Sequence, residues 1–326
     1  MKAAAAASEP SVSLTLALIR EAHARIRDKI HRTPILTSAT LDTAAQAKLF
    51  FKCENLQKAG AFKARGATNA VFSLPDEAAK HGVVTHSSGN HAAALARAAK
   101  MRGIRCYVVM PRNAPNAKQA AVRRYGGEVI LCEPTLAARE AGAREVIAQT
   151  GAVLIHPYND LRVMAGQGTT AIELLEDVPD LDIILCPVGG GGQLSGIAVA
   201  AKGIKPAIKV IGVEPAGADD ASRSFRAGRI IPCDQPNTIA DGLLTTVGDK
   251  PFAEIRRYVD DIVTVPEEAI VQAMRTIWEV LKIIVEPSGA VPYAALSGGA
   301  LNVTAQRVGV ILSGGNLDLD KLPWQG

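Results

Sequence analysis

The sequence predicts an α/β protein with a parallel sheet, and three observations support this prediction. From residue 82 onward, short apolar runs alternate with amphipathic stretches of helical period, which is the pattern of a parallel sheet covered by helices on both faces. The length of 326 residues suggests about two domains. Hydrophobic residues make up 48% and charged residues 21% of the chain, as in a folded globular protein and unlike a disordered or fibrous one.

Seven segments have the apolar, β-branched composition of buried strands. They are residues 83–87, 106–110, 128–132, 153–156, 183–188, 210–214 and 308–313. Four stretches between them have helical periodicity: 90–102, 116–125, 135–149 and 166–175. Parallel α/β sheets bind ligands at the carboxyl ends of their strands, so the loops that follow the strands are candidate sites. Four of these loops are rich in glycine, serine or acidic residues: 87–91, 189–192, 214–220 and 313–316.

Charge and composition exclude several classes of protein. The 36 basic and 32 acidic residues give a net charge of +4, and they are scattered, so no nucleic-acid partner is expected. No apolar run approaches the ~18 residues of a membrane span. The first ten residues, MKAAAAASEP, lack the apolar core of a signal peptide, and we interpret them as a frayed tail of a cytoplasmic protein. The five cysteines include no CxxC spacing, which predicts buried thiols rather than disulfides or a zinc site.

Four successive glycines, Gly189 to Gly192, follow the apolar run 183–188 and lead into a helix expected to begin near Gln193. Glycine lets the backbone approach a ligand closely, and the N–H groups at a helix N-terminus favour an anion. The spacing does not match GxGxxG, because Ser195 stands where the third glycine belongs, and no GxxxxGK[ST] is present. A cofactor with a single phosphate is therefore favoured over NAD or ATP.

Lys63 lies in the segment NLQKAGAFKARGA, residues 55–67, within small residues that lead into a helix. A lysine becomes a Schiff-base nucleophile when its ammonium group is desolvated and its pKa is lowered. The local pattern alone also fits a solvated surface lysine.

Seven segments of the chain form a recognisable set: 55–67, THSSGNH (85–91), PVGGGGQLSG (187–196), EPAGADDA (214–221), TIADG (238–242), VEPSGA (285–290) and LSGGN (312–316). Together they resemble the serine/threonine dehydratase and serine racemase family, which consists of pyridoxal-phosphate enzymes of the tryptophan-synthase-β-like fold (fold type II). The resemblance runs in the same order from about residue 14 to the C-terminus. It implies a large twisted-sheet domain, residues 1–81 and 159–326, into which a smaller α/β domain, residues 82–158, is inserted and closes over the substrate.

The resemblance assigns cofactor roles to particular residues. Lys63 would hold pyridoxal 5'-phosphate covalently, and Phe62 would lie against its ring. Gly189, Gly190, Gly191, Gly192 and the backbone of Gln193 would bind its phosphate. Asn90 would donate a hydrogen bond to the phenolic oxygen of the ring. Ser313 would face the ring nitrogen, where a hydroxyl does not hold that nitrogen protonated as an aspartate would, and this weaker electron sink favours elimination.

The substrate carboxylate would lie on the loop Ser87, Ser88, Gly89, Asn90 and His91, at N–H groups that begin a helix. The implied reaction is the dehydration of a β-hydroxy amino acid such as serine or threonine, with Lys63 removing the α-proton and a 2-oxo acid and ammonia as products. Ser88, across from Lys63, could instead return a proton to the opposite face, which would make the enzyme a serine racemase. Ser88 also fits a purely structural role as a helix cap.

The loop EPAGADDA resembles the family's site for a divalent cation. Glu214, Asp220 and the backbone carbonyl of Ala218 would supply hard oxygen ligands suited to Mg, Mn or Ca. The role of that metal would be structural.

The substrate and several details remain open at this stage. Dehydratases of serine, threonine, 3-hydroxyaspartate and phenylserine share these segments, and Arg139 is a candidate partner for the second carboxylate of 3-hydroxyaspartate. Ala92 and Ala93 replace the Gly-Gln of animal serine racemases, so nucleotide activation is not implied. Tyr158 stands where the racemase pattern has Asn after His-Pro. A homodimer is implied. A synthase on the same scaffold and a catalytically inactive binding protein are the alternatives.

Overall fold

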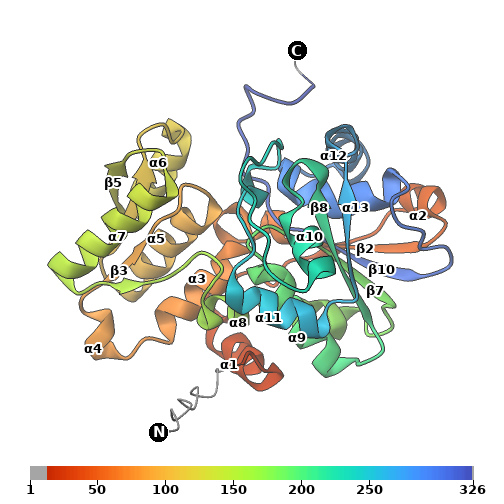
Figure 1. The fold of residues 1–326 in the computed structure, drawn as a ribbon. Coiled ribbons are helices and arrows are strands. Elements are labelled where there is room, and N and C mark those ends of the chain that lie inside the picture. Colours follow the sequence, from red (N-terminus) through yellow and green to blue (C-terminus); the bar gives the residue numbers. More distant parts are fainter. Residues whose placement is uncertain (1–12, 325–326) are drawn as a thin grey trace, which may run out of the picture.

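Two sheets organise residues 13–324, the part of the chain that the computed structural model describes (Figure 1). The larger sheet has six strands in the order β1-β2-β10-β7-β8-β9, and only β1 is antiparallel to its neighbour. The smaller sheet has four parallel strands in the order β5-β4-β3-β6. The α/β prediction is therefore confirmed. The segment MKAAAAASEP lies outside the described residues.

The strands of the larger sheet are β1 (Ile35–Leu36), β2 (Lys48–Cys53), β7 (Ile183–Pro187), β8 (Lys209–Pro215), β9 (Asp261–Val265) and β10 (Arg307–Leu312). Those of the smaller sheet are β3 (Val83–Thr85), β4 (Cys106–Pro111), β5 (Glu128–Cys132) and β6 (Val153–Leu154). The smaller sheet is thus built entirely within residues 83–154. The domain limits 82–158 remain a prediction.

Helices cover both faces of each sheet, because the connections between parallel strands are right-handed crossovers that return over the sheet. The helices around the larger sheet are α1 (Leu16–Ile26), α2 (Ala39–Ala45), α3 (Lys63–Phe72), α8 (Leu161–Asp177), α9 (Gly192–Ile204), α10 (Asp220–Ala227), α11 (Asp249–Tyr258), α12 (Glu267–Thr276) and α13 (Pro287–Ser297). Around the smaller sheet lie α4 (Asp76–Ala79), α5 (Asn90–Arg102), α6 (Asn116–Arg124) and α7 (Leu136–Thr150), on the left of Figure 1.

The central strands of the larger sheet are buried on both faces. Along β7, Ile184 and Cys186 pack into one apolar core with α8 and α9, and Ile183 and Leu185 pack into the core on the opposite face with α12 and α13. Side chains alternate between the faces of a strand, so a strand covered on both sides reads as a continuous apolar run. This explains why β7 was predictable from sequence.

The five cysteines are free thiols, and the structure corrects the prediction that all of them are buried. Cys53, Cys106 and Cys186 are buried, whereas Cys132 and Cys233 are partly exposed. In residues 13–324, no helix is both long and apolar enough to cross a lipid bilayer.

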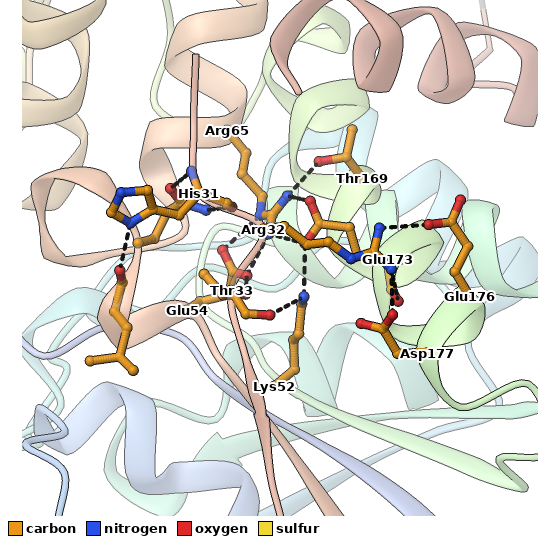
Figure 2. A network of polar contacts seen from close by, with 12 residues as sticks. His31, Arg32, Thr33, Lys52, Glu54, Arg65, Thr169, Glu173, Glu176 and Asp177 are labelled. Atoms are coloured by element: carbon orange, nitrogen blue, oxygen red, sulfur yellow. Dashed lines mark hydrogen bonds and ion pairs between the residues drawn. The ribbon is translucent and has the colours of Figure 1, made fainter. Parts of the chain in front are cut away.

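A buried ionic network links α3, α8 and the turn after β2 (Figure 2). Arg65 on α3 donates two hydrogen bonds of 2.7 Å to the carboxylate of Glu54 and two of 2.7 Å to that of Glu173. A fifth bond of 3.1 Å reaches the hydroxyl of Thr169. None of the three charged side chains is more than 2% exposed. The guanidinium therefore has its complete set of partners, as a buried charge requires.

Lys52 of β2 completes the charge balance. Its Nζ donates to Glu173 at 2.7 Å and to the carbonyl of Thr33 at 2.8 Å. Two cations thus face two carboxylates. Burial by itself would raise the pKa of Glu173, but hydrogen bonds and charge from Arg65, together with Lys52, lower that pKa to about 2. Glu173 is therefore ionised at neutral pH, and the network carries no net charge.

We expect Glu54→Gln to destabilise the fold strongly. The variant keeps the shape of the side chain but leaves Arg65 and Lys52 facing one carboxylate, and breaking a buried ion pair in this way costs about 3–5 kcal/mol. The free energy of unfolding, measured by urea titration, tests this. The matched control is Arg275→Ala, which removes an exposed pair with Glu279 and should cost less than ~1 kcal/mol. Equal losses in the two variants would contradict the prediction.

Candidate active site

A cavity of about 400 Å³ is lined by loops from both sheets. Three of the four loops singled out from the sequence line it, namely 87–91 after β3, 189–192 after β7 and 313–316 after β10. The fourth, 214–220, does not. The predicted cofactor and substrate residues that line the cavity are Phe62, Lys63, Ser87, Ser88, Gly89, Asn90, His91, Gly189, Gly190, Gly191, Gly192, Gln193 and Ser313. The structure therefore brings this whole set together in one place.

Lys63 is placed in the cavity by contacts between its own loop and the loop after β10. Ala61 forms a β-bridge with Gly314, and the N–H of Phe62 donates to the carbonyl of Ser313 at 3.0 Å. Lys63 then begins α3, so residues 250 positions apart in the sequence, Lys63 and Ser313, lie next to one another.

The amine of Lys63 is held in a low-dielectric environment. Its Nζ donates to the carbonyl of Pro157 at 2.9 Å and lies 4.9 Å from the centre of the Phe62 ring. Burial lowers the pKa of Lys63 to about 8, although the carboxyl of Glu286 acts in the opposite direction. A lysine with such a pKa has a substantial neutral fraction near pH 7 and can act as a nucleophile or base.

The tetraglycine loop presents a set of unused N–H donors. In the described part of the chain, the backbone N–H groups of residues 189–193 donate to no protein acceptor. The side-chain amide Nε2 of Gln193 is also buried and has no partner. These donors lie at the N-terminus of α9, which begins at Gly192. Unpaired donors at a helix N-terminus form a site for an anion such as phosphate.

Two of these glycines are required by their surroundings. A Cβ at Gly190 would lie 2.4 Å from the ring of Tyr158, closer than any side chain tolerates. Gly191 has φ +84°, a backbone conformation that glycine adopts without strain. Packing around the loop therefore excludes side chains at these two positions, while the N–H groups of the described loop have no protein acceptor.

The loop after β3 is anchored by its polar side chains. The ring Nε2 of His91 lies 3.2 Å from the carbonyl of Ile155, and burial holds the pKa of His91 well below its usual range. The ring is therefore neutral. Asn90 donates from Nδ2 to the carboxylate of Glu286 at 2.8 Å. Ser88 lines the cavity. The structure thus fixes the loop at its C-terminal end, where α5 begins.

Sequence reasoning assigned no role to several polar residues of the cavity. Among them are Lys118, Asp241, Glu286 and Asn316. Lys118 on α6 and Asp241, at the start of a short 3-10 helix (Asp241–Leu243), form an ion pair between the smaller and larger sheet regions. Asp241, Glu286 and Asn316 fall within the segments TIADG, VEPSGA and LSGGN, so the signal was present, but nothing in the sequence shows that they meet.

Fold, cavity and buried lysine together define a pyridoxal-phosphate enzyme, and comparison with known proteins agrees. The sequence model of the family described as pyridoxal-phosphate dependent enzyme matches residues 26–314. The chain belongs to this family.

Within the family, the chain belongs with the serine racemases and hydroxy-amino-acid dehydratases. It is 54% identical to a serine racemase of Arabidopsis thaliana over 93% of each chain. It is 53% identical to a β-hydroxyaspartate dehydratase of Paracoccus denitrificans, over 93% of this chain and 96% of that protein. The structure of maize serine racemase superposes with a TM-score of 0.93 at 49% identity, covering 95% of each chain. The predicted family and fold type II are therefore confirmed.

The residues of the cavity fit the family's cofactor. The unpaired N–H groups of 189–193 match a phosphate, and the neutral fraction of Lys63 matches an aldehyde that must be attacked by an amine. Ser313, which is 2% exposed, lines the same cavity and offers a hydroxyl. The same cavity therefore offers polar atoms both for a phosphate and for a ring nitrogen.

The loop predicted to bind a metal lies apart from this cavity. Glu214 accepts hydrogen bonds from the N–H groups of Ala221 and Ser222 at 2.9 and 2.8 Å. Asp220 accepts one from the N–H of Val247 through Oδ2 at 2.9 Å, while its Oδ1 is buried and has no partner in residues 13–324. Burial raises the pKa of Glu214 to about 8 and that of Asp220 to about 6. An unpaired buried oxygen of this kind fits a hard cation.

The lowered pKa of Lys63 predicts how the cofactor-free protein captures pyridoxal phosphate. With a pKa of about 8, the neutral fraction at pH 7 is about 10%, against roughly 0.03% for an ordinary lysine. Covalent attachment at Lys63 should rise about tenfold from pH 6 to 7 and level off above pH 8. Borohydride reduction followed by peptide mass spectrometry measures the adduct.

The exposed Lys48 provides the internal control for this measurement. A Lys63 profile that follows Lys48 would show that the amine is not desolvated.

Proposed function

We propose that the chain is a pyridoxal-phosphate-dependent dehydratase of β-hydroxy amino acids such as serine or threonine, giving a 2-oxo acid and ammonia. The observation that carries this proposal is the meeting, in one cavity, of a desolvated lysine, an unpaired N–H cradle and a hydroxyl residue, Ser313. Relatives named as serine racemase and β-hydroxyaspartate dehydratase support the substrate class.

Each residue has a role that follows from its position. Bound pyridoxal phosphate would withdraw electrons from the α-carbon of the amino acid and so acidify its α-hydrogen. The loop 189–193 would hold the phosphate, and the N–H groups at the start of α5 would hold the substrate carboxylate. Nζ of Lys63, released when substrate binds, would take the α-proton. The β-hydroxyl would leave as water, so that the α-proton and the hydroxyl together account for the water lost, and hydrolysis of the released enamine would give the 2-oxo acid and ammonia.

Ser313 supports elimination as the main reaction. A hydroxyl facing the ring nitrogen does not hold it protonated, so negative charge on the α-carbon is less stabilised than it would be beside a carboxylate. Prompt departure of the β-hydroxyl is then favoured over return of a proton.

The second candidate activity is amino-acid racemisation, and the presence of Ser88 in the cavity favours it. Its hydroxyl would return the proton to the α-carbon on the face opposite Lys63. Serine racemases among the similar proteins also support this candidate.

A direct assay separates the two activities. Purified protein with pyridoxal phosphate and magnesium is incubated with each enantiomer of serine, the threonine stereoisomers, threo-3-hydroxyaspartate and phenylserine, and chiral chromatography resolves enantiomers and 2-oxo acids. We expect more oxo acid than enantiomer. Lys63→Ala should abolish both products, because it removes the base and the attachment point. Ser88→Ala should remove only racemisation. Faster formation of enantiomer than of oxo acid would make the protein a racemase.

Arg139 favours 3-hydroxyaspartate as one substrate. It is half-buried on α7, lines the cavity, and makes no side-chain hydrogen bond or ion pair within residues 13–324. Its positive charge lies close enough to lower the pKa of His86, for which burial is the larger cause. A guanidinium without a partner beside the substrate site suits a second carboxylate.

Arg139→Gln should therefore raise KM for 3-hydroxyaspartate by about ten- to a hundredfold, because a charge-assisted hydrogen bond is lost. KM for serine, which has no second carboxylate, should change less than about threefold. Arg144→Gln, an exposed change on the same helix, is the matched control. Parallel increases for both substrates in Arg139→Gln would exclude the specificity role.

The cation, the oligomeric state and the location complete the proposal. Glu214, Asp220 and the carbonyl of Ala218 would bind Mg, Mn or Ca as a structural ion, supported by the unpaired oxygen of Asp220. We propose a homodimer in the cytoplasm. Leu56 and Ile284, 44% and 46% exposed, support an apolar contact with a second copy.

A further inference from the structure

Three polar residues of the cavity form a connected set, which we call the amide clamp: Asn90, Glu286 and Asn316. Nδ2 of Asn90 donates to Oε1 of Glu286 at 2.8 Å, and Oδ1 of Asn90 accepts from Nδ2 of Asn316 at 2.9 Å. The backbone N–H of Asn316 donates to Oε2 of Glu286 at 3.1 Å. The clamp therefore joins the loops that follow β3 and β10 to the start of α13.

The direction of every hydrogen bond in the clamp is set by backbone atoms. Nδ2 of Asn316 also donates to the carbonyl of Ala59 at 2.7 Å, and a carbonyl only accepts. The backbone N–H of Asn316 only donates, so the Glu286 oxygen that faces it must accept. Between these two fixed ends, the amide of Asn90 has one orientation in which all partners agree.

This orientation leaves one N–H of Asn90 unused. An amide nitrogen has two donors, and only the bond to Glu286 is formed by Nδ2 within residues 13–324. Asn90 lines the cavity together with Lys63 and Ser313. The reverse orientation would present the amide oxygen, which repels a negatively charged oxygen of a ligand.

The carboxyl group of Glu286 accepts these hydrogen bonds in a buried environment. It is 3% exposed, and the charged groups around it are Lys63, Asp241 and Lys118. Burial and the negative charge of Asp241 raise the pKa of Glu286 to about 8, against the hydrogen bond from Asn90. Burying a carboxyl group costs free energy. The hydrogen bonds that Glu286 accepts from Asn90 and Asn316 offset part of that cost.

We propose that Glu286 is a positioning residue that, together with Asn316, fixes the amide of Asn90 with an N–H directed at the phenolic oxygen of the cofactor ring. The inference rests on the proposed function through the role given there to pyridoxal phosphate. Glu286 acts through Asn90 and does not itself have to touch the cofactor.

Glu286→Gln is the informative substitution, because it preserves shape but disrupts the agreement of donors and acceptors. The amide oxygen of the introduced glutamine must accept from the N–H of Asn316, so the NH₂ group of that glutamine faces Nδ2 of Asn90. If Asn90 turns over, its nitrogen meets Nδ2 of Asn316, which the carbonyl of Ala59 holds in place. Both orientations of the Asn90 amide therefore place two hydrogen-bond donors opposite each other, with no acceptor between them.

The experiment compares wild type, Glu286→Gln and Glu254→Gln as holoenzymes. Glu254 is also buried, accepts one backbone N–H, that of Leu14 at 2.9 Å, and does not line the cavity. Fluorescence titration with pyridoxal phosphate measures Kd, and the pH dependence of the visible absorbance of the bound cofactor reports on its ring oxygen. Glu286→Gln should raise Kd at least about tenfold and shift the pH of the absorbance change, whereas Glu254→Gln should leave both unchanged.

Further variants keep the test decisive. Asn316→Asp removes the donor to Asn90 and should reproduce the spectral shift, and Glu286→Asp, which keeps a carboxylate, should restore the wild-type spectrum in part. Unchanged Kd and spectrum in folded Glu286→Gln would overturn the inference. If wild type itself captures no pyridoxal phosphate at Lys63, the proposed function fails first, and this outcome is distinguished by the borohydride-trapped adduct.

Discussion

Arg65 carries a buried positive charge, and the carboxylates that neutralise this charge hold together the elements around the cavity. Its two carboxylate partners come from different elements, Glu54 from the turn after β2 and Glu173 from the middle of α8. The guanidinium is a rigid planar fork, so these bonds fix the rotation of α3 about its axis. Lys63 lies two residues earlier, about 200° around the helix, and therefore faces the opposite side, toward the cavity.

The amide clamp and the Arg65 network are buried polar systems of opposite character. Around Arg65, cations and carboxylates balance, and Glu173 stays ionised. In the clamp, Glu286 has only neutral donors as hydrogen-bond partners. The first system suits a permanent structural anchor. The second places Glu286 in the same cavity as Lys63, and each of these two groups has a pKa of about 8.

Sequence patterns predicted most of the smaller sheet and its helices. The expected segments 128–132 and 90–102 coincide with β5 and α5, because each is periodic and ends at glycine or a polar turn. Strand β2 was missed since Lys48 and Lys52 interrupt its apolar pattern, and only the tertiary partners of Lys52 explain its burial. Strand β9 was missed for the related reason that its short run, DIVTV, begins with an acidic residue.

For the site, as for the strands, the residues marked by local sequence were predicted, and those defined by tertiary contacts were not. Residues such as Lys63 and the tetraglycine loop were found because resemblance or local composition marks them. Glu286 was overlooked, since its importance comes from hydrogen bonds to residues 196 and 30 positions away. Such pairings depend on which strand ends lie side by side in the folded sheets, and periodicity carries no information on that order.

The contact between Gly190 and Tyr158 has a consequence for the substitutions that this chain can accept. The aromatic ring occupies the space that any side chain at position 190 would need. Position 190 is therefore restricted to glycine while the ring is present, and a larger residue fits there only together with a smaller residue at position 158.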